Sequence, residues 1–158
     1  MDRRRLLCAA PVAFICLAAD QLAKLYVRVS LPVCDQFPIV DCARMRLGAL
    51  TLIRVQNRGT GYLFLRDPVV ALVLGLVGCV LVLVYAVWLG RLSWVAVVGV
   101  GLQAGGALSN VLDRLLVGAA NDYVNLTPTF TFNLADLMLL VGTVLAVASI
   151  ARRLGGDP

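Results

Sequence analysis

The chain has 158 residues, of which 61% are hydrophobic, with a formal net charge of +5 and a mean hydropathy of +0.91. Soluble domains contain roughly 45–50% apolar residues, so this composition predicts one integral membrane domain over 1–158 and argues against a nucleic-acid-binding protein. The sequence has no His and no Glu, which excludes Ser-His-Asp triads, Cys-His pairs and HExxH zinc sites. A metal site would have to be built from Asp and Cys alone, and no two Cys have CxxC spacing.

The first hydrophobic segment, 6–27, follows three arginines at 3–5 and resembles a secretory signal peptide. We interpret it instead as a retained membrane span, because a helix of this length extends about 33 Å and can cross a bilayer. Asp20 and Lys24 near its far end share a helix face and can pair. The pair has two interpretations, a salt bridge that closes the helix end or a direct role at a site.

The segment 29–67 is less apolar and contains a strand-like stretch, ALTLIRVQN at 49–57, followed by a glycine turn signal. These features predict a small β-sheet on the extracytoplasmic surface of the membrane. Cys34 and Cys42 both fall in this segment, so a disulfide between them is possible. Spacing alone leaves that question open.

Three further apolar segments predict the remaining spans of a four-helix membrane protein: 69–89, 93–112 and 132–150, with a turn at 90–92. Four glycines in the third span allow close helix packing, namely Gly99, Gly101, Gly105 and Gly106. The segment 115–131 is too short and too polar to span. We expect it to form a short interfacial helix or loop.

Arginines at 3–5, 91 and 152–153 mark one side of the membrane, which the positive-inside rule assigns to the cytoplasm together with both termini. The segment 29–67 with Arg28 also carries six arginines, but it is longer and folded, and therefore has less weight. With this orientation, polar residues far apart in the sequence meet at the outer side of the membrane. They are Asp20, Lys24, Asn57, Asn110, Asp113, Arg114, Asp122, Asn133 and Asp136.

Ionisable groups at membrane depth are costly, so such a cluster predicts a functional site. Asn110, Asp113 and Arg114 project from one helix face, and Asn133 and Asp136 share another. Two carboxylates held together in a low dielectric share one proton, and such a pair can activate water and protonate a leaving amide nitrogen. The pattern therefore predicts aspartic peptidase chemistry, although the spacing does not identify which two of the three Asp form the pair.

Two alternatives use the same residues differently. In a non-catalytic membrane paralogue or a small transporter, the acids would form a proton relay or a structural network. In a serine-lysine hydrolase, Lys24 would act with Ser30 or Ser109. The second alternative leaves the three Asp without a role.

Five short motifs follow one another along the chain: DQLAK at 20–24, NRGTGY at 57–62, GGALSNVLDR at 105–114, NDY at 121–123 and FNLAD at 132–136. Together they resemble the lipoprotein signal peptidases, the type II signal peptidases of bacteria, over nearly the full length of the chain. Each motif alone is weakly specific. Their common order on a four-span chain of this length is much more specific.

The resemblance implies that Asp122 and Asp136 are the catalytic pair. It implies that substrate is held and the pair oriented by Asn57, Gly59, Asn110, Arg114 and Asn133, with structural support from Asp20, Lys24 and Asp113. The implied reaction is removal of a prolipoprotein signal peptide before a diacylglyceryl-modified cysteine, without metal or cofactor. The implied location is the bacterial inner membrane, with the site facing the periplasm, and we expect a monomer whose partners are prolipoproteins and membrane lipids.

The chain also departs from the pattern of that family. Ser109 stands in place of Gly and Asn121 in place of an apolar residue, and further differences occur at Thr60, Gly61, Tyr62, Tyr123, Leu137 and Met138. Because both implied catalytic acids are present, we expect an active peptidase.

Overall fold

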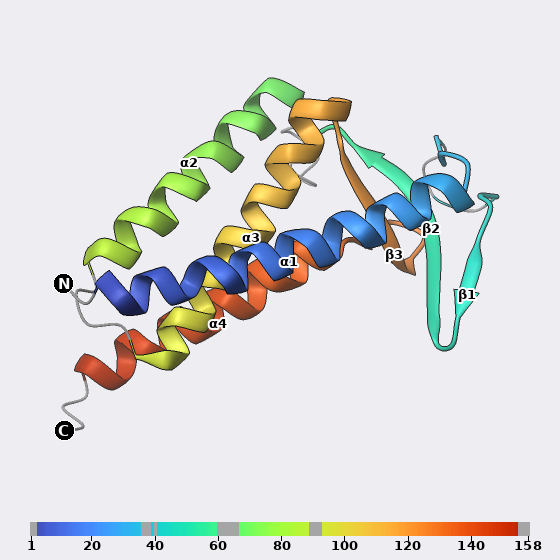
Figure 1. Cartoon of the computed structure of the whole chain (residues 1–158). Coiled ribbons are helices and arrows are strands. Elements are labelled where there is room, and N and C mark those ends of the chain that lie inside the picture. Colours follow the sequence, from blue (N-terminus) through green and yellow to red (C-terminus); the bar gives the residue numbers. More distant parts are fainter. Residues whose placement is uncertain (1–2, 36–38, 40, 60–66, 89–92, 155–158) are drawn as a thin grey trace.

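The computed structural model describes residues 3–35, 39, 41–59, 67–88 and 93–154. Its elements follow in the order α1 (Arg3–Ser30), β1 (Met45–Leu47), β2 (Leu50–Asn57), α2 (Pro68–Trp88), α3 (Trp94–Val117), β3 (Ala120–Thr127), β4 (Phe130–Phe132) and α4 (Leu134–Leu154). The helices form one bundle, and the sheet extends from one end of it. Both termini lie at the opposite end (Figure 1).

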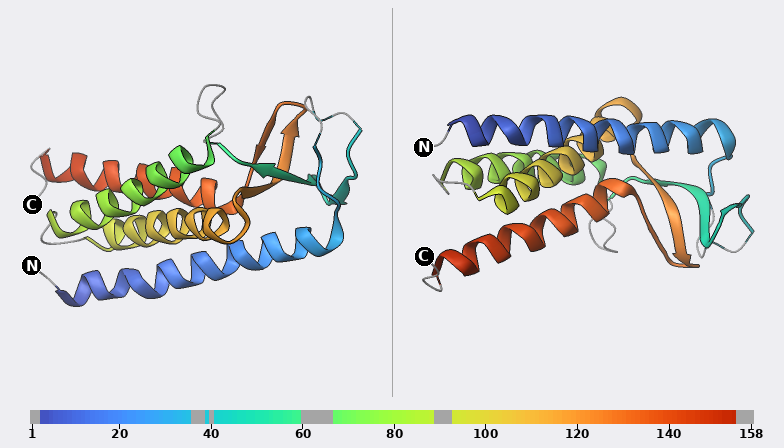
Figure 2. Two further views of the ribbon diagram at one scale, coloured as in Figure 1. Left: turned by 90° about the horizontal axis from the view of Figure 1, so that it is seen from above. Right: turned by 60° about the horizontal axis from the view of Figure 1, so that its bottom comes forward.

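Helix α3 is the central helix of the bundle and packs against α1, α2 and α4 (Figure 2). Its glycines allow the neighbouring backbones to approach closely. A Cβ at Gly105 would lie 2.6 Å from the Ala13 carbonyl oxygen of α1, and one at Gly106 would lie 2.6 Å from the Ala135 carbonyl oxygen of α4. The predicted packing role of these glycines agrees with these contacts.

Three of the described helices are long and apolar enough to cross a membrane: Leu7–Ser30, Trp94–Val117 and Leu134–Arg152. Their outer faces carry exposed apolar side chains such as Phe14 and Leu140, as expected for surfaces in contact with lipid. The described apolar part of α2, Pro68–Val82, is shorter. The segment predicted as a span at 69–89 is therefore helical, and that this helix crosses the membrane stays a prediction. The predicted fold class, a helical membrane protein with a small antiparallel sheet, is confirmed.

The sheet has the strand order β1-β2-β3-β4, and each neighbouring pair is antiparallel. Strand β2 coincides with the strand-like stretch predicted at 49–57. Its register with β3 places Val55 opposite Asp122 and Asn57 opposite Ala120. The end of β2 is thereby brought beside the acidic residue of β3.

The prediction for 115–131 was wrong. Helix α3 continues to Val117 and ends at Gly118, whose φ of 76° is the left-handed conformation that glycine adopts readily. The chain then forms β3 and β4 rather than an interfacial helix or loop. The polar residues of this segment are not in a surface loop, since Asn121 and Asp122 are buried in a polar cluster.

Cys34 and Cys42 form a disulfide, which resolves the question that their spacing left open. The bond lies in the segment between α1 and β1, on the sheet side of the bundle. The Cys34 N–H donates a hydrogen bond to the Arg54 carbonyl oxygen over 2.7 Å, which connects this segment to β2. The predicted turn at 90–92 and the motif residues 60–62 lie outside the described residues.

Candidate active site

The first turn of α4 carries Asp136 and is closed by a reciprocal pair of hydrogen bonds. The Asp136 N–H donates to Asn133 Oδ1 over 2.9 Å, and the Asn133 N–H donates to Asp136 Oδ2 over 3.1 Å. This is the geometry of a capping box, with Asn at the N-cap and an acid three residues later. The carboxylate of Asp136 is consequently fixed relative to the backbone of its own helix.

Asp122 lies on β3 with its side chain almost fully buried. Its two carboxylate oxygens accept hydrogen bonds from different elements, since Asn133 Nδ2 donates to Oδ1 over 2.8 Å and Asn57 Nδ2 donates to Oδ2 over 3.0 Å. Asn133 thus contacts both acids, Asp122 through its side chain and Asp136 through its backbone. The structure brings the two predicted acids into one hydrogen-bonded group.

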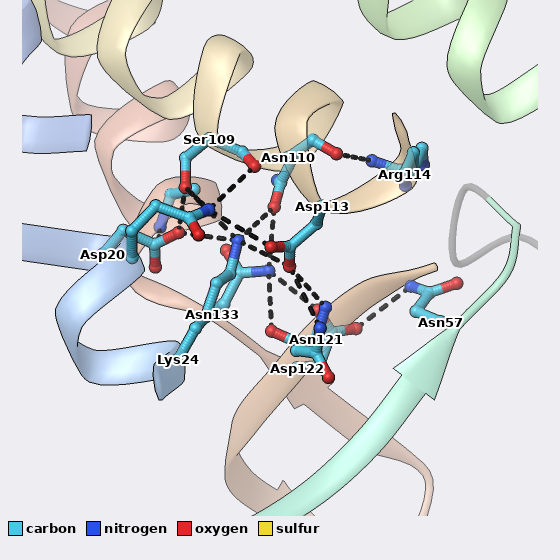
Figure 3. A network of polar contacts seen from close by, with 12 residues as sticks. Asp20, Lys24, Asn57, Ser109, Asn110, Asp113, Arg114, Asn121, Asp122 and Asn133 are labelled. Atoms are coloured by element: carbon cyan, nitrogen blue, oxygen red, sulfur yellow. Dashed lines mark hydrogen bonds and ion pairs between the residues drawn. The ribbon is translucent and has the colours of Figure 1, made fainter. Parts of the chain in front are cut away.

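Asn110 of α3 connects this group to the middle of the bundle. Its Nδ2 donates to Asp136 Oδ1 over 2.8 Å. Its Oδ1 accepts from Asn133 Nδ2 over 3.1 Å and from Lys24 Nζ over 2.9 Å. Figure 3 shows the side chains of Asn110, Asn133 and Asp122 converging from α3, α4 and β3.

Arg114 lies one helical turn after Asn110. Its guanidinium donates to the Asn110 carbonyl oxygen over 3.2 Å and to the Gly59 carbonyl oxygen over 2.9 Å. It also interacts electrostatically with Asp122 and Asp136. Arg114 therefore holds the end of β2 against α3 and places a positive charge near both acids.

The charge state of Asp122 differs from that of an exposed carboxyl. Burial and, to a smaller extent, the negative charge of Asp136 together raise the pKa of the Asp122 carboxyl to about 7. Hydrogen bonds from Asn57 and Asn133 and the charge of Lys24 act in the opposite direction. A proton is therefore retained at this pair near neutral pH.

Asp20, Lys24 and Asp113 form a second layer that is fully buried. Lys24 Nζ lies 2.6 Å from Asp20 Oδ2 and 3.2 Å from Asp113 Oδ2. Asp113 is also paired with Arg28 at 2.6 Å. The predicted pairing of Asp20 with Lys24 is present, and Asp113 shares the same cation.

Four members of this layer were not identified as members of the aspartic site from the sequence: Gln21, Ser109, Asn121 and Tyr123. Arg28 lies outside the layer, partly exposed, and contacts it through Asp113. Ser109 had been considered as the nucleophile of a serine-lysine hydrolase and as a departure from a family pattern, and Asn121 only as a departure, yet both bind buried acids. The Ser109 hydroxyl donates to Asp20 over 2.5 Å, and the Asn121 N–H donates to Asp113 over 2.9 Å. Ser109 precedes Asp113 by four residues, so helical periodicity would have placed both on one face.

The geometry does not favour a serine-lysine hydrolase. Ser109 Oγ lies 3.4 Å from Lys24 Nζ, but both side chains are completely buried. The Ser109 hydroxyl donates its hydrogen bond to Asp20. A substrate has no access to such a hydroxyl. Among the described residues, no group of three His, Cys, Asp or Glu side chains is arranged to hold a metal ion.

Residues 12–152 match the family model described as signal peptidase (SPase) II. The chain is 30% identical to the lipoprotein signal peptidase of Halothermothrix orenii, over 86% of this chain and 90% of that protein. It is 32% identical to the lipoprotein signal peptidase of Hydrogenovibrio crunogenus, over 87% and 81% of the two chains. It is 31% identical to the one of Xanthomonas campestris pv. campestris, over 82% and 80%.

The fold is similar to that of a bacterial membrane enzyme solved by the in meso method, with a TM-score of 0.77 and 18% identity over 94% of this chain and 91% of that one. A bundle with three helices long enough to span a membrane and a buried polar site defines the class of this chain as a multi-pass membrane protein. The family match makes that class specific. The chain belongs to the signal peptidase II family and is a peptidase.

Proposed function

We propose that this chain is an aspartic endopeptidase that removes signal peptides from diacylglyceryl-modified prolipoproteins, cleaving before the lipidated cysteine. The observation that carries the aspartic mechanism is the shared contact of Asn133 with Asp122 and Asp136. Burial and the charge of Asp136 raise the pKa of Asp122, which supports one proton held by the pair near neutral pH. The membership of the chain in the signal peptidase II family supports the choice of substrate.

In the proposed reaction, the ionised member of the pair removes a proton from a water molecule, which attacks the scissile carbonyl carbon. The protonated member gives its proton to the carbonyl oxygen, which forms a tetrahedral diol. The member that took up the water proton then passes it to the amide nitrogen, the C–N bond breaks, and one diol proton returns to the other carboxylate. Asn110 and Asn133 orient the carboxyls. Arg114, Asn57 and Gly59 hold the substrate backbone beside them.

The test replaces one carboxylate oxygen at a time. Asp122→Asn and Asp136→Asn, purified in detergent, are expected to lose cleavage of a lipidated precursor by about four orders of magnitude, as in other sites where catalytic residues act as a unit. Asp67→Asn is the matched control, because its exposed carboxylate only caps the start of α2. Full activity of either site variant would reject the dyad. Precursor binding without cleavage by the wild type would favour the non-catalytic alternative.

The site is proposed to face the periplasm from the bacterial inner membrane. Both termini lie at the end of the bundle opposite the sheet (Figure 1), and the terminal arginines at 3–5 and 152–153 favour the cytoplasm for that end. The single domain 1–158 is proposed to act as a monomer in contact with membrane lipids. A fluorescent protein fused to the C-terminus should fluoresce, and a periplasmic phosphatase fused there should be inactive. The reverse result would invert the topology.

A further inference from the structure

The buried pair of Asp20 and Lys24 has contacts that a salt bridge at a helix end does not need. Asp20 Oδ2 binds Lys24 and Ser109, and its other oxygen, Oδ1, accepts from the Ala135 N–H over 3.1 Å and from the Tyr123 hydroxyl over 3.2 Å. Ala135 directly precedes Asp136. A carboxylate on α1 thus satisfies a free N–H group in the first turn of α4, the turn that carries one of the proposed catalytic acids.

The same hydroxyl of Tyr123 completes this arrangement. It accepts a hydrogen bond from the Leu134 N–H over 3.1 Å while it donates to Asp20. The N–H groups of Leu134, Ala135 and Asp136 are therefore bound by side chains of β3, α1 and the N-cap residue. The position of this turn depends on Asp20 as well as on its own capping box.

Lys24 contacts Asn110, the side chain of α3 that binds the carboxylate of Asp136. An ammonium group has only donor hydrogens, so the Asn110 atom that faces Lys24 Nζ at 2.9 Å must be the amide oxygen. The NH2 group then points to Asp136 Oδ1, 2.8 Å away. Lys24 Nζ, together with Asn133 Nδ2 at 3.1 Å, therefore fixes which end of the Asn110 amide meets the carboxylate.

An ion pair in the interior gives little net stability, because desolvation offsets most of the attraction. Two apolar side chains would join α1 to α3 equally well. The contacts of this pair lead instead to the two structures that hold Asp136, which are the first turn of α4 and the Asn110 amide.

We infer that Asp20 and Lys24 are positioning residues for the catalytic pair, an inference that rests on the function proposed above. Lys24 orients the Asn110 amide toward Asp136. Asp20 fixes the turn of α4 on which Asp136 lies. Neither side chain touches the substrate, since both are completely buried.

The charge of Lys24 provides a readout that a purely structural role would not affect. It lowers the pKa of Asp122, so its removal should raise the pH at which Asp122 loses its proton. The other charged or titratable groups packed around this region are Asp20 and Arg28 of α1, Asp113 and Arg114 of α3, Tyr123 of β3 and Asp136 of α4. All of these groups except Arg28 are unchanged in both variants of the comparison described next.

The test compares Lys24→Met with Arg28→Met. Both variants remove one cation from α1, and both cations are paired with Asp113. Within the described part of the chain, the Arg28 side chain binds Asp113 and not Asn110. We expect Lys24→Met to lower kcat about 10- to 100-fold, as small displacements of reacting groups do, with KM changed less than about threefold. Arg28→Met should keep kcat within about twofold of wild type. Equal losses of kcat in the two variants would overturn the inference.

The protonation of Asp122 is followed separately, by infrared titration of the carboxylic acid band that Asp122→Asn removes. The midpoint should rise in Lys24→Met and stay at the wild-type pH in Arg28→Met. This measurement needs no substrate. Failure of the wild type to cleave the precursor would therefore reject the proposed function, whereas an unmoved midpoint in Lys24→Met would reject the inference.

Lys24→Met leaves Asp20 without its cation and can prevent folding. The double variant Asp20→Asn/Lys24→Met removes both charges, and the amide oxygen of Asn at position 20 can still accept from the Ala135 N–H. A folded double variant should retain the low kcat, because the Asn110 amide oxygen has lost the shorter of the two hydrogen bonds that fix its orientation. Wild-type kcat in the folded double variant would overturn the role of Lys24.

Discussion

Asn133 and Asp136 bind each other through two hydrogen bonds at the start of α4, each backbone N–H donating to the other residue's side chain over 2.9 and 3.1 Å. The capping box that begins the helix therefore includes one of the proposed catalytic acids. The Asn133 side chain then extends to Asp122. Helix initiation and alignment of the acids depend on the same residue.

Replacing Asn133 by Ala should therefore affect stability and catalysis together. Loss of an N-cap costs about 1 kcal/mol of unfolding free energy. The loss of the hydrogen bond from the Asn133 amide to Asp122 should lower kcat by about 100-fold. Ser93→Ala is the matched control, because Ser93 caps α3 by accepting from the Ala96 N–H over 3.2 Å. It should show a similar loss of thermal stability with normal kcat, and a comparable loss of activity in the control would show that capping alone explains the effect.

The pH dependence of cleavage should report the proton held at the pair. With the pKa of Asp122 near 7, kcat should decline above about pH 7 as that proton is lost. The hydrogen bond from Asn57 favours the ionised form, so Asn57→Ala should move this alkaline limb to higher pH. The control is Asn125→Ala on the same sheet, because the Asn125 side-chain amide donates to the Thr127 carbonyl oxygen and not to either acid within the described residues. This variant should leave the alkaline limb in place. A limb shifted to lower pH in Asn57→Ala would contradict the assignment.

The same pKa makes stability depend on pH in a defined direction. Asp122 has a raised pKa in the folded state, about 7 against 3.8, so between these values the folded protein binds a proton that the unfolded chain does not. The contribution is present at low pH and is lost as pH rises, with a slope of about 1.4 kcal/mol per pH unit. Thermal unfolding in detergent from pH 4.5 to 7.5 should show wild-type stability falling more steeply than that of Asp122→Asn. Parallel curves would refute the raised pKa.

Close packing of α3 against α4 should be as important for the site as the hydrogen bonds. A Cβ at Gly106 would lie 2.6 Å from the Ala135 carbonyl oxygen, so Gly106→Ala must displace the first turn of α4. We expect a loss of about 1–3 kcal/mol in unfolding free energy and a fall in kcat. Gly78→Ala in α2 meets no atom within 4 Å and should be neutral or slightly stabilising. Normal kcat in Gly106→Ala would show that α4 can adjust.

Much of the fold could be predicted because long apolar segments allow few structures in a membrane. The helices at α1, α3 and α4 and the strand β2 follow directly from such patterns. Strands β3 and β4 were missed because buried Asn and Asp side chains resemble loop residues when only their polarity is considered. Polarity is informative about exposure only where no polar cluster is available to bind the side chain.

The members of the candidate site could be predicted, but most of their contacts could not. Assigning one membrane side to the ends of three helices was enough to group Asp122 with Asp136. The bond between Asp20 and the Ala135 N–H joins residues 115 positions apart, and no local spacing indicates it. Such contacts depend on how the helices pack, which the pattern of apolar residues determines only coarsely.

The dependence of the first turn of α4 on α1 and β3 also bears on biosynthesis. Asp20 and Tyr123 emerge from the ribosome before Ala135, and the N–H groups that they bind belong to α4. A growing chain that lacks α4 contains both side chains but not Asp136. In the proposed mechanism, cleavage therefore begins only after α4 has been inserted, so an incomplete chain cannot cut neighbouring proteins while it is being made.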